Sequence, residues 1–573
     1  TYSKVIPMGE FEKVMCANRG EIAIRVFRAC RELGLKTVAV YSDADKKTLA
    51  VKMADEAYNI GPPMPTESYL NIPRLIETAK AADVDAIHPG YGFLAENIDF
   101  AKACESEGIK FIGPTSKAIA TMGVKDVAKA TVIANKVPTV PGSEGILEDS
   151  REALALAKEM GFPVIIKAAY GGGGKGMRVV WKAEDFISNF EAAQREGSVA
   201  FGHPEVYMEK FIIDPRHIEV QVLRDEHGNV VHFGERDCSI QRRNQKLIEE
   251  APSPALVNNP ELQEAIREAG VRAAVAADYT SAGTVEFIFK DGQFYFMEMN
   301  TRIQVEHCVS EMYANRDILR RQIEVAMGRK LDITQDDIEF RGHAMECRIN
   351  AEDPFNDFMP TPGAVTRYET PGGAGIRIDS AAFDGFQISP FYDSMIAKLI
   401  VWDEDRRRCI DRVYRALGEF VIKGVKTTIP LHQRMMKNPD FITGNFDTGY
   451  MARSKFVEKM KEEVEAEKAA ELARREAEGM GNDRIAAIAP DLPETWGAET
   501  VDATDALVVP GLVDLHAHLG FKLHGRLVAP DEVCPPSGVT TAVDMGTTGA
   551  FTISWHRENA VAASRTRLLA FVN

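Results

Sequence analysis

The chain has 573 residues, too many for one hydrophobic core, so several domains are expected. Hydrophobic residues make up 45% and charged residues 27%, as in soluble globular proteins, and a formal net charge of −17 argues against a nucleic-acid or anionic-membrane partner. No apolar run is long enough to cross a bilayer, and the 8 scattered cysteines, without a Cys-x-x-Cys pair, predict reduced thiols in a cytoplasmic protein.

The N-terminal region, residues 11–120, alternates between strand and helix patterns. An apolar strand over 13–17 is followed by a helix over 22–33 and a strand over 37–41. This βαβ unit predicts a parallel sheet. The segment 85–93 is a strand end followed by a turn-rich loop, at the sheet edge where open α/β folds place ligands.

Four further regions follow. Residues 125–205 have the pattern of a smaller module, and residues 206–350 add long strands. Residues 350–450 are rich in Pro-Gly turns and short strands, which is typical of an antiparallel β-rich lobe. From 455 to 478, Glu, Lys, Ala and Arg dominate and predict a helix with mixed charges. Such a helix either joins two units through solvent or docks a partner.

A run of glycines occupies residues 171–176, between two predicted strands of the smaller module. Glycine lets backbone N–H groups approach phosphates closely, although a plain flexible turn has the same composition. No Gly-Lys-Ser/Thr opens a helix here, so the run is not a Walker P-loop. Lys125 and Lys167 supply the positive charge with which proteins hold polyphosphates, so together they indicate an ATP site.

Two carboxylates, Glu286 and Glu298, lie on a predicted β-hairpin. A two-residue turn at Asp291 and Gly292 would place them on opposite faces, because a one-residue slip reverses every side chain. A three-residue loop with Gly292 in the left-handed region would place them on one face, together with Asn300, and we predict that loop. Two carboxylates and an amide suit the oxygen ligation of Mg²⁺, and a surface hairpin with exposed acids is the alternative.

The segment 238–246 reads Cys-Ser-Ile-Gln-Arg-Arg-Asn-Gln-Lys and carries three cations. By itself it is typical of a solvated charged loop. With Arg302 and Arg348 it has the composition of a pocket for a small planar anion, which guanidinium forks suit.

Ordered motifs along the chain resemble one known family. They are ANRGEIA at 17–23, HPGYGF at 88–93, ERDCS at 235–239, EMNTRIQVEH at 298–307 and ECRINAED at 346–353. With them, residues 11 to about 456 resemble the biotin carboxylases, ATP-grasp subunits of the split pyruvate carboxylase and acetyl-CoA carboxylase type. Ordered motifs over most of a chain are far more specific than a lone glycine-rich loop.

The resemblance implies an α/β fold of successive domains. They are a Rossmann-like (pre-ATP-grasp) domain with a parallel sheet at 11–124, an ATP-grasp domain at 125–340 with a small lid at about 140–205, a β-rich C-terminal domain at 341–456, a charged helical linker at 457–482 and a partial segment of another kind at 483–573.

The resemblance also implies a reaction. ATP would phosphorylate bicarbonate to carboxyphosphate, and the CO₂ released from it would carboxylate N1 of biotin carried on a partner protein. The reaction would use ATP, Mg²⁺ or Mn²⁺, and biotin, with bicarbonate as substrate. Closure of the glycine loop would keep water away from carboxyphosphate.

The family's functional residues fall on matching positions of this sequence. Glu306 would take the proton of bicarbonate, Arg348 would stabilise the negative charge on the ureido oxygen of biotin, and Tyr91 would lie beside the biotin ring. The remaining implied contacts are Lys246, Arg302, Gln304 and Val305 for bicarbonate, Glu286, Glu298 and Asn300 for the metal, and Lys125, Lys167, Gly172, Gly173, Gly174, Glu209, Lys210, Ile212, His217 and Gln241 for the nucleotide.

No Ala-Met-Lys-Met biotin attachment site appears in the sequence. The resemblance therefore implies that the biotin carboxyl carrier protein and the carboxyltransferase are separate chains, and that this chain performs only the first half-reaction. It also implies a homodimer. The final acceptor, whether pyruvate, acetyl-CoA or another acyl-CoA, belongs to the chemistry of the transferase.

Three positions depart from the family pattern. Val124 stands where an Asp is common, just before Lys125. Asn244 replaces a frequent His, and Cys308 replaces a frequent Pro after His307, a change expected to loosen that turn. None of the three removes a residue of the implied catalytic set.

The C-terminal segment 483–573 resembles a different family. Its run VPGLVDLHAH and the strand pattern at 538–544 look like the opening of a metal-dependent amidohydrolase. His516 and His518, two residues apart on a strand, face the same way and can share a metal. A barrel with one or two strands cannot close, so no hydrolase activity is expected from this fragment.

Three other functions are open to this sequence. Another ATP-grasp ligase, joining an acid to an amine through an acyl phosphate, would share the phosphate and metal groups but would not need Tyr91, Lys246, Glu306 and Arg348. A non-catalytic ATP-binding or scaffold module built around the charged helix would need neither the metal carboxylates nor a base. A hydrolase driven by the C-terminal histidines lacks its barrel and would be vestigial.

Overall fold

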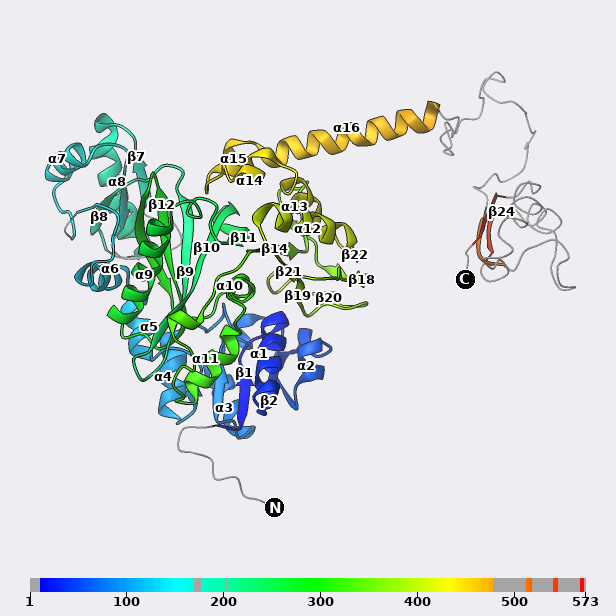
Figure 1. Ribbon diagram of the computed structural model, residues 1–573, viewed down its shortest axis with the longest axis horizontal. Helices are drawn as coiled ribbons and strands as arrows, with labels where there is room; N and C mark the ends of the chain where they lie inside the picture. Colours follow the sequence, from blue (N-terminus) through cyan, green and yellow to red (C-terminus); the bar gives the residue numbers. More distant parts are fainter. Residues whose placement is uncertain are drawn as a thin grey trace, which may run out of the picture. The chain divides into compact units, whose positions relative to one another are not determined.

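The structure is a computed structural model that describes residues 11–143, 145–168, 177–201, 203–477, 512–517, 539–544 and 567–570. The chain divides into two compact units, residues 1–473 and 474–573 (Figure 1). Within the described part, no helix combines the length and the apolar character needed to cross a membrane. The predicted glycine contacts Gly172, Gly173 and Gly174, and the predicted His518, lie outside the described residues.

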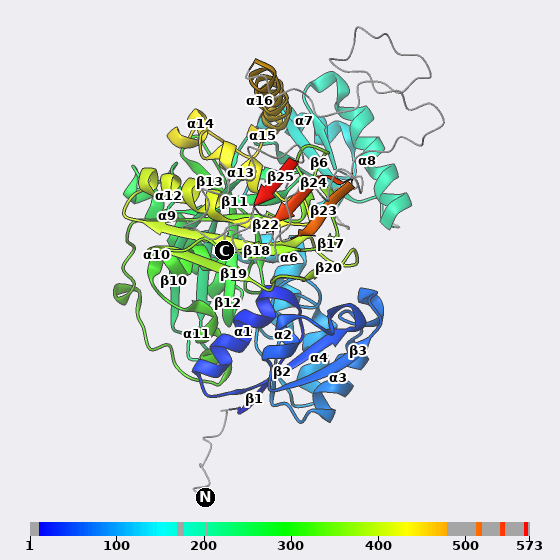
Figure 2. The same ribbon diagram turned by 90° about the vertical axis from the view of Figure 1, so that its right-hand side faces the viewer.

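A parallel sheet opens the first unit, in the order β3-β2-β1-β4-β5 (Figure 2). The βαβ pattern predicted this sheet, and the prediction is confirmed. Strand order reverses between β1 and β4, so a ligand crevice is expected at their carboxyl ends. There Asn18 Nδ2 donates to the carbonyls of Pro89 and Tyr91, at 2.8 Å each, and fixes the turn-rich loop. The elements are β1 (Lys13–Cys16), α1 (Gly20–Glu32), β2 (Lys36–Ser42), α2 (Leu49–Met53), β3 (Glu56–Gly61), α3 (Ile72–Ala81), β4 (Ala86–His88), α4 (Ile98–Ser106) and β5 (Lys110–Phe111).

An antiparallel sheet of eight strands forms the centre of the unit, in the order β13-β12-β9-β10-β11-β14-β21-β19. Its strands are β9 (Arg216–Arg224), β10 (Val230–Arg242), β11 (Gln245–Ala251), β12 (Ser281–Lys290), β13 (Gln293–Asn300), β14 (His343–Asn350), β19 (Ile376–Ser380) and β21 (Met395–Asp403).

The two faces of this sheet differ in chemistry. On β9, Ile218, Val220 and Val222 pack into an apolar core with α9 (Pro260–Ala276). Glu219 and Gln221 alternate with them and are fully buried on the opposite face, where α10 (His307–Ala314) packs against β10 and β14. Helix α11 (Ile318–Ala326) packs on β12. The sheet therefore carries buried polar side chains on the face that α10 covers.

A separate sheet of three strands, β7-β6-β8, makes the smaller module that the sequence predicted. Its apolar side chains, among them Phe186 and Phe190, form a core of their own. The elements of this module are α7 (Ser150–Met160), β6 (Val164–Ala168), β7 (Met177–Val180), α8 (Phe186–Phe201) and β8 (Val206–Lys210). The helices α5 (Ser116–Gly123) and α6 (Lys125–Ala134) precede it in the chain and pack instead against β13, with α6 also against α9.

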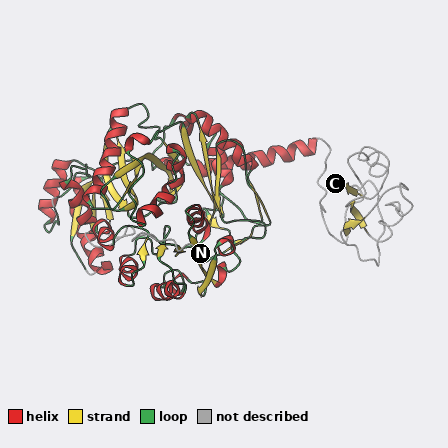
Figure 3. Ribbon diagram, turned by 60° about the horizontal axis from the view of Figure 1, so that its bottom comes forward, coloured by secondary structure: helices red, strands yellow, loops and turns green. Residues whose placement is uncertain are grey.

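The region 350–450 is less purely β than expected. The helix α12 (Arg406–Glu419) buries Cys409, Ile410 and Val413 against β14 and β21, and its arginines concealed that apolar stripe in the sequence. Figure 3 shows helices packed around the strands. The further elements are β15 (Glu352–Asp353), β16 (Met359–Pro360), β17 (Gly363–Ala364), β18 (Arg367–Glu369), β20 (Gln387–Ile388), β22 (Val421–Lys423), α13 (Ile429–Met435), α14 (Pro439–Thr443) and α15 (Tyr450–Arg453).

The charged helix predicted after residue 455 is α16 (Phe456–Ala477). In the second unit, β23 (Leu512–Ala517), β24 (Val539–Asp544) and β25 (Arg567–Ala570) pair in parallel, with β24 in the middle. His516 belongs to β23.

Candidate active site

The hairpin of β12 and β13 places two acidic side chains opposite each other. Its turn has two residues, because Lys290 pairs with Gln293 and both turn residues have positive φ. The predicted three-residue loop is therefore wrong. A β-bulge at Met297 shifts the register by one residue, so that Glu286 pairs with Glu298. The bulge, and not the turn, brings both carboxylates to one face.

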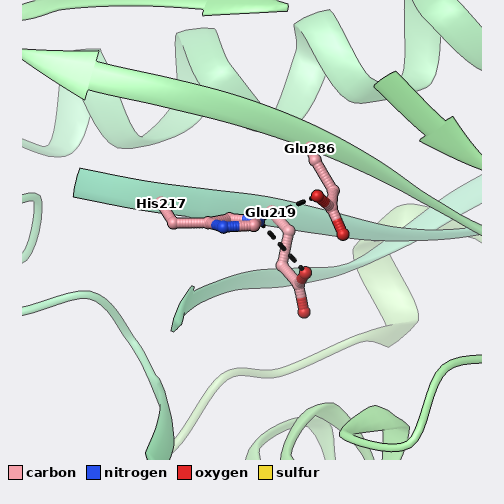
Figure 4. Close-up of side chains that lie close together, drawn as sticks. All are labelled: His217, Glu219 and Glu286. Carbon is pink, nitrogen blue, oxygen red and sulfur yellow. Dashed lines mark ion pairs between the residues drawn. The ribbon is translucent and has the colours of Figure 1, made fainter. Parts of the chain in front are cut away.

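Glu286, Glu298 and Asn300 form an oxygen-rich set. Asn300 Nδ2 donates to Glu286 Oε1 at 2.8 Å, and His217 Nε2 lies 2.9 Å from Glu286 Oε2 (Figure 4). Burial opposes ionisation of Glu286, but Lys246 and His217 outweigh it and hold the pKa of Glu286 well below its usual range.

Glu298 differs from its partner across the hairpin. It is exposed and has no hydrogen-bond or ion-pair partner among the residues that the structure describes. Desolvation by the surrounding protein and the neighbouring Glu286 carboxylate raise the pKa of Glu298. A divalent cation fits this donor set, because it would relieve the repulsion between two facing carboxylates with the oxygen ligands it prefers.

Lys246, near the start of β11, joins three carboxylates. Its Nζ donates to Glu219 at 2.6 Å, to Glu286 at 3.1 Å and to Glu306 at 2.6 Å. Burial alone would lower the pKa of Lys246, but these carboxylates raise it well above its ordinary value. Figure 4 shows Glu219 and His217 of β9 beside Glu286 of β12. Lys246 is thus a permanently charged ammonium at the centre of a buried acidic cluster.

Glu306 caps the N-terminus of α10 and lies between two cations. Its Oε1 accepts from Lys246 at 2.6 Å and its Oε2 accepts from Arg348 Nη2 at 3.0 Å. Arg348 is anchored in turn by Glu249, whose Oε1 accepts from Arg348 Nε at 2.6 Å. Burial would raise the pKa of Glu306, yet Lys246, Arg348 and Arg236 hold it well below its usual range. Glu306 is therefore ionised.

Arg236 holds this cluster together, although the sequence analysis assigned it no role. Its buried guanidinium donates to Glu219 Oε1 at 2.6 Å, Gln221 Oε1 at 2.9 Å, Ser310 Oγ at 2.9 Å and Gln304 Oε1 at 2.8 Å. Because Gln304 Oε1 faces Arg236, its Nε2 faces Glu286 and donates to it at 2.8 Å. Arg236 belongs to the ERDCS motif, but nothing in the sequence showed that its guanidinium is buried inside the protein.

Arg302 and Val305 come from the segment between β13 and α10. Arg302 donates to Asn300 Oδ1 at 3.0 Å through Nη2 and to Glu96 Oε2 at 2.9 Å through Nε. The carbonyl of Val305 accepts from the Nζ of fully buried Lys398 at 2.9 Å. Glu96 and Lys398 were missed by the sequence analysis, since both lie in stretches without a chemical pattern.

Tyr91 reaches this cluster from the N-terminal sheet. Its hydroxyl hydrogen-bonds the carboxylate of Glu21, and Glu21 Oε1 lies 3.0 Å from Lys398 Nζ. The structure thus links Tyr91 to Val305 through two charged groups, Glu21 and Lys398.

Several predicted nucleotide contacts form a second group. Lys167 of β6 donates to Glu209 of β8 at 2.5 Å, and Lys129 donates to the same carboxylate at 2.7 Å. Burial opposes ionisation of Glu209, but the two lysines outweigh it and lower its pKa. The sequence analysis missed Lys129, which lies one helical turn after Lys125 on α6 and therefore on the same side of that helix.

The other predicted nucleotide contacts lie apart from Lys167. Lys210 Nζ donates to the carbonyl of Gly161 at 2.8 Å. Because successive side chains of a strand point to opposite faces, Lys210 lies on the other side of β8 from Glu209. Ile212 is half-buried just after β8. Gln241 Nε2 lies 3.5 Å from His217 Nδ1 and donates to a backbone carbonyl at 3.0 Å, and His217 in turn lies beside Glu286 of the hairpin of β12 and β13.

The three departures from the family pattern have visible settings. Val124 is the N-cap of α6, and its side chain makes no capping hydrogen bond. Asn244 lies with Arg243 in the tight turn between β10 and β11 at positive φ, which Asn tolerates. Cys308 is buried in the first turn of α10, and its thiol donates to Glu346 Oε2 at 2.7 Å.

Comparisons with known proteins cover the chain from residue 10 to 453. Three family models match: "Biotin carboxylase, N-terminal domain" over 10–119, "Carbamoyl-phosphate synthase L chain, ATP binding domain" over 125–334 and "Biotin carboxylase C-terminal domain" over 346–453. The chain is 55% identical over 442 residues to Biotin carboxylase 1 of Bacillus subtilis, covering 77% of this chain and 98% of that protein. It is 52% identical to the 2-oxoglutarate carboxylase small subunit of Hydrogenobacter thermophilus, covering 77% and 93%.

A solved structure gives the same likeness in three dimensions. The biotin carboxylase domain dimer of the Hydrogenobacter thermophilus 2-oxoglutarate carboxylase, in complex with MgADP, ADP and bicarbonate, superposes with a TM-score of 0.72 at 52% identity. The match covers 78% of this chain and 98% of that chain.

Proposed function

The chain belongs to the biotin carboxylase family, and on this premise we propose that it is an ATP-dependent ligase that carboxylates biotin with bicarbonate through carboxyphosphate. The observation that carries the proposal is Glu306, an ionised and buried carboxylate placed between Lys246 and Arg348. An acid–amine ligase has no need of this arrangement.

Glu306 is the base of the proposed reaction. It takes the proton of bicarbonate, so that a bicarbonate oxygen attacks the γ-phosphorus of ATP, the bond to ADP breaks and carboxyphosphate forms. Lys246, Arg302, Gln304 and Val305 hold the bicarbonate. Lys246 also keeps its positive charge throughout, because three carboxylates surround it. Glu286, Glu298 and Asn300 hold the divalent cation, Mg²⁺ or Mn²⁺, which when bound neutralises charge on the ATP phosphates.

Arg348 serves the second step. Carboxyphosphate breaks into CO₂ and phosphate, the phosphate takes the N1 proton of biotin, and N1 then bonds to CO₂ while Arg348 stabilises the negative charge on the ureido oxygen. Its position depends on Glu249, which holds the guanidinium from the far side at 2.6 Å. Tyr91 borders the biotin ring, steadied by the Glu21 carboxylate.

The nucleotide is held by the group of residues around Lys167 and Glu209. Lys125 and Lys167 meet the phosphates, and the loop with Gly172, Gly173 and Gly174 closes over them to exclude water. Lys129 joins them, since it already shares the Glu209 carboxylate with Lys167. The remaining contacts on this side are Glu209, Lys210, Ile212, His217 and Gln241.

The partners proposed for the chain follow from its relatives. The Bacillus protein is named as a biotin carboxylase and the Hydrogenobacter protein as the small subunit of a carboxylase. We therefore assign the biotin carboxyl carrier and the carboxyltransferase to separate chains. The Hydrogenobacter structure is described as a dimer, and we propose the same association here, in the cytoplasm.

The second unit has its own proposed origin. The parallel strands β23 and β24 have the pairing expected of the first strands of a β/α barrel, and His516 lies on β23. We propose that this segment is related to the opening strands of a metal-dependent amidohydrolase.

The test of the proposed function is ATP cleavage by the purified full chain, with and without bicarbonate and free biotin, compared between the parent and Glu306→Gln. Cleavage should require bicarbonate, increase with biotin and fall by roughly 100-fold or more in the variant, the usual contribution of a positioned base. Glu268→Gln, at an exposed position of α9, is the matched control and should retain the parent rate. Cleavage indifferent to both bicarbonate and biotin would return the chain to the wider group of ATP-grasp ligases.

A further inference from the structure

Two buried carboxylates lie beside the base, and neither is assigned a contact with bicarbonate, nucleotide or biotin in the reaction described so far. Glu249 on β11 and Glu346 on β14 are directly opposite each other in the antiparallel ladder, and both side chains are fully buried. Directly opposed residues bring their side chains within contact distance. Each carboxylate also keeps one oxygen, Oε2 of Glu249 and Oε1 of Glu346, without a hydrogen-bond partner among the described residues.

The groups that face this pair carry too little positive charge for two anions. Glu249 Oε1 accepts from Arg348 Nε at 2.6 Å, but Arg348 also pairs with Glu306. Lys246, the next cation, is already shared by three other carboxylates.

On the Glu346 side, the thiol of Cys308 in α10 donates to Oε2, and Tyr91, whose hydroxyl is bonded to Glu21, lies close enough for the charge of Glu346 to act on it. Lys398 on β21 lies close enough to act on Glu346, yet it is 3.0 Å from Glu21 and 3.7 Å from Asp379. Every cation near the pair thus has carboxylate partners elsewhere.

We propose that Glu249 and Glu346 hold one proton between them in the working enzyme and thereby keep the positive charge of Arg348 available to the ureido oxygen of biotin. This inference rests on the proposed function, and it makes the two residues positioning residues for Arg348. Two facing carboxylates in a dry site cannot both ionise cheaply, so one proton is retained by the pair as a whole. Burial and the neighbouring Glu249 raise the pKa of Glu346, and burial raises the pKa of Glu249 despite Arg348.

The proton matters because of what Arg348 must do. With the pair doubly ionised, three carboxylates, Glu249, Glu346 and Glu306, would face one guanidinium and cancel its field at the biotin site. With one proton on the pair, that excess negative charge is removed before biotin binds, which is the preorganisation that stabilises a developing oxyanion.

Cys308 acts on this pair through the hydrogen bond of its thiol. Its thiol stabilises the ionised form of Glu346 and so lowers the pKa of that carboxyl. A proline at this position would offer no such donor. Removing the thiol should therefore make the pair hold its proton to higher pH.

The first readout is the ratio of biotin-stimulated to biotin-independent ATP cleavage by the full chain, followed from neutral to alkaline pH at saturating bicarbonate. The parent ratio should fall with rising pH, approaching a slope of about tenfold per pH unit, as the pair loses its proton. In Glu346→Gln, an uncharged residue of the same shape, the alkaline fall should disappear, and in Cys308→Ala it should move to higher pH. An alkaline fall in Glu346→Gln that coincides with the parent curve would overturn the proposal.

The second readout needs no activity. Infrared difference spectra of the parent against Glu346→Gln should show the carbonyl band of one protonated carboxylic acid at neutral pH, lost on alkaline titration. Cys308→Ala keeps both carboxylates and should retain the band to higher pH, so it replaces Glu346→Gln if that variant fails to fold. Absence of the band in the parent at neutral pH would also overturn the proposal. If the parent shows the band but cleaves no ATP with bicarbonate, the proposed function fails and the shared proton stands.

Discussion

The group around Lys246 and the group around Lys167 both set lysine against glutamate, but the fold holds them differently. Lys246 meets three carboxylates on the α10-covered face of the eight-stranded sheet, and 12% of its side chain is exposed. Lys167 meets one carboxylate, shared with Lys129, on a sheet of three strands, and 26% of its side chain is exposed. The Lys246 group is therefore an interlocked buried network and the Lys167 group is an isolated half-buried contact.

This contrast separates two demands of the reaction. Charged side chains stabilise a short-lived intermediate best when they are held immobile and shielded from water. Each such buried charge must then be paired with an opposite charge of the protein. Charges that hold a nucleotide must accept and release it, and a half-exposed lysine can exchange a carboxylate for a phosphate. Loss of a charge should therefore lower folding stability in the Lys246 group and ligand affinity in the Lys167 group.

Arg236→Met should show the largest effect on stability. The substitution leaves Glu219 buried with one of its two cations missing, and breaking a buried ion pair costs about 3–5 kcal/mol in the free energy of unfolding. Urea denaturation followed by circular dichroism measures it. Arg407→Met, whose partner Asp411 is exposed on α12, is the control and should cost about 1 kcal/mol or less. Equal losses in the two variants would contradict the idea that Arg236 holds the network together.

Lys167→Met should show an intermediate effect, and on affinity rather than stability. Loss of a charged hydrogen-bond donor to phosphate corresponds to about 1.5–3 kcal/mol, or a roughly 10- to 100-fold higher KM for ATP. The free energy of unfolding should fall by less than in Arg236→Met, because Lys167 is partly exposed and Lys129 still pairs with Glu209. Lys158→Met, on the exposed side of α7 in the same module, should leave both quantities unchanged. A loss of stability as large as that of Arg236→Met would remove the distinction between the two groups.

Val124→Asp should show the smallest effect and a favourable one. Val124 has the extended backbone of an N-cap but no acceptor, so an Asp side chain would satisfy a free N–H of α6 and add about 1 kcal/mol to the free energy of unfolding. Thermal unfolding measures the gain. Val124→Ala is the matched control, because it removes the exposed apolar side chain without adding a cap. A gain of the same size in Val124→Ala would show that capping is not the cause.

The sequence predicted which residues form the site better than it predicted how the backbone brings them together. Glu286 and Glu298 were expected on one face, and they are, but through a bulge at Met297 instead of a longer turn. The sequence of the hairpin alone does not distinguish a bulge in the strand from a longer turn. Phe287 and Phe296 pack into the core under α9, and that packing together with the opposed acids fixes where the extra residue lies.

The residues that sequence reasoning missed share one property. Arg236, Lys398, Glu96 and Lys129 act through partners on other elements, and no pattern in the chain shows which partner each one meets. Helix α12 was missed for a different reason, since its apolar positions recur at helical spacing in the sequence but are interrupted by arginines.

The sequence by itself determined the parallel N-terminal sheet, the charged helix α16 and the family, because strand and helix periodicity and ordered motifs are local properties of the chain. Only the tertiary structure decided which charges meet. Arg348 and Glu249 are 99 residues apart, and Lys246 and Glu306 are 60 apart. Because these side chains are buried together on one face of the sheet, their charges interact strongly although they are far apart in the sequence. Their proximity depends on long-range strand pairing, which no local sequence pattern specifies.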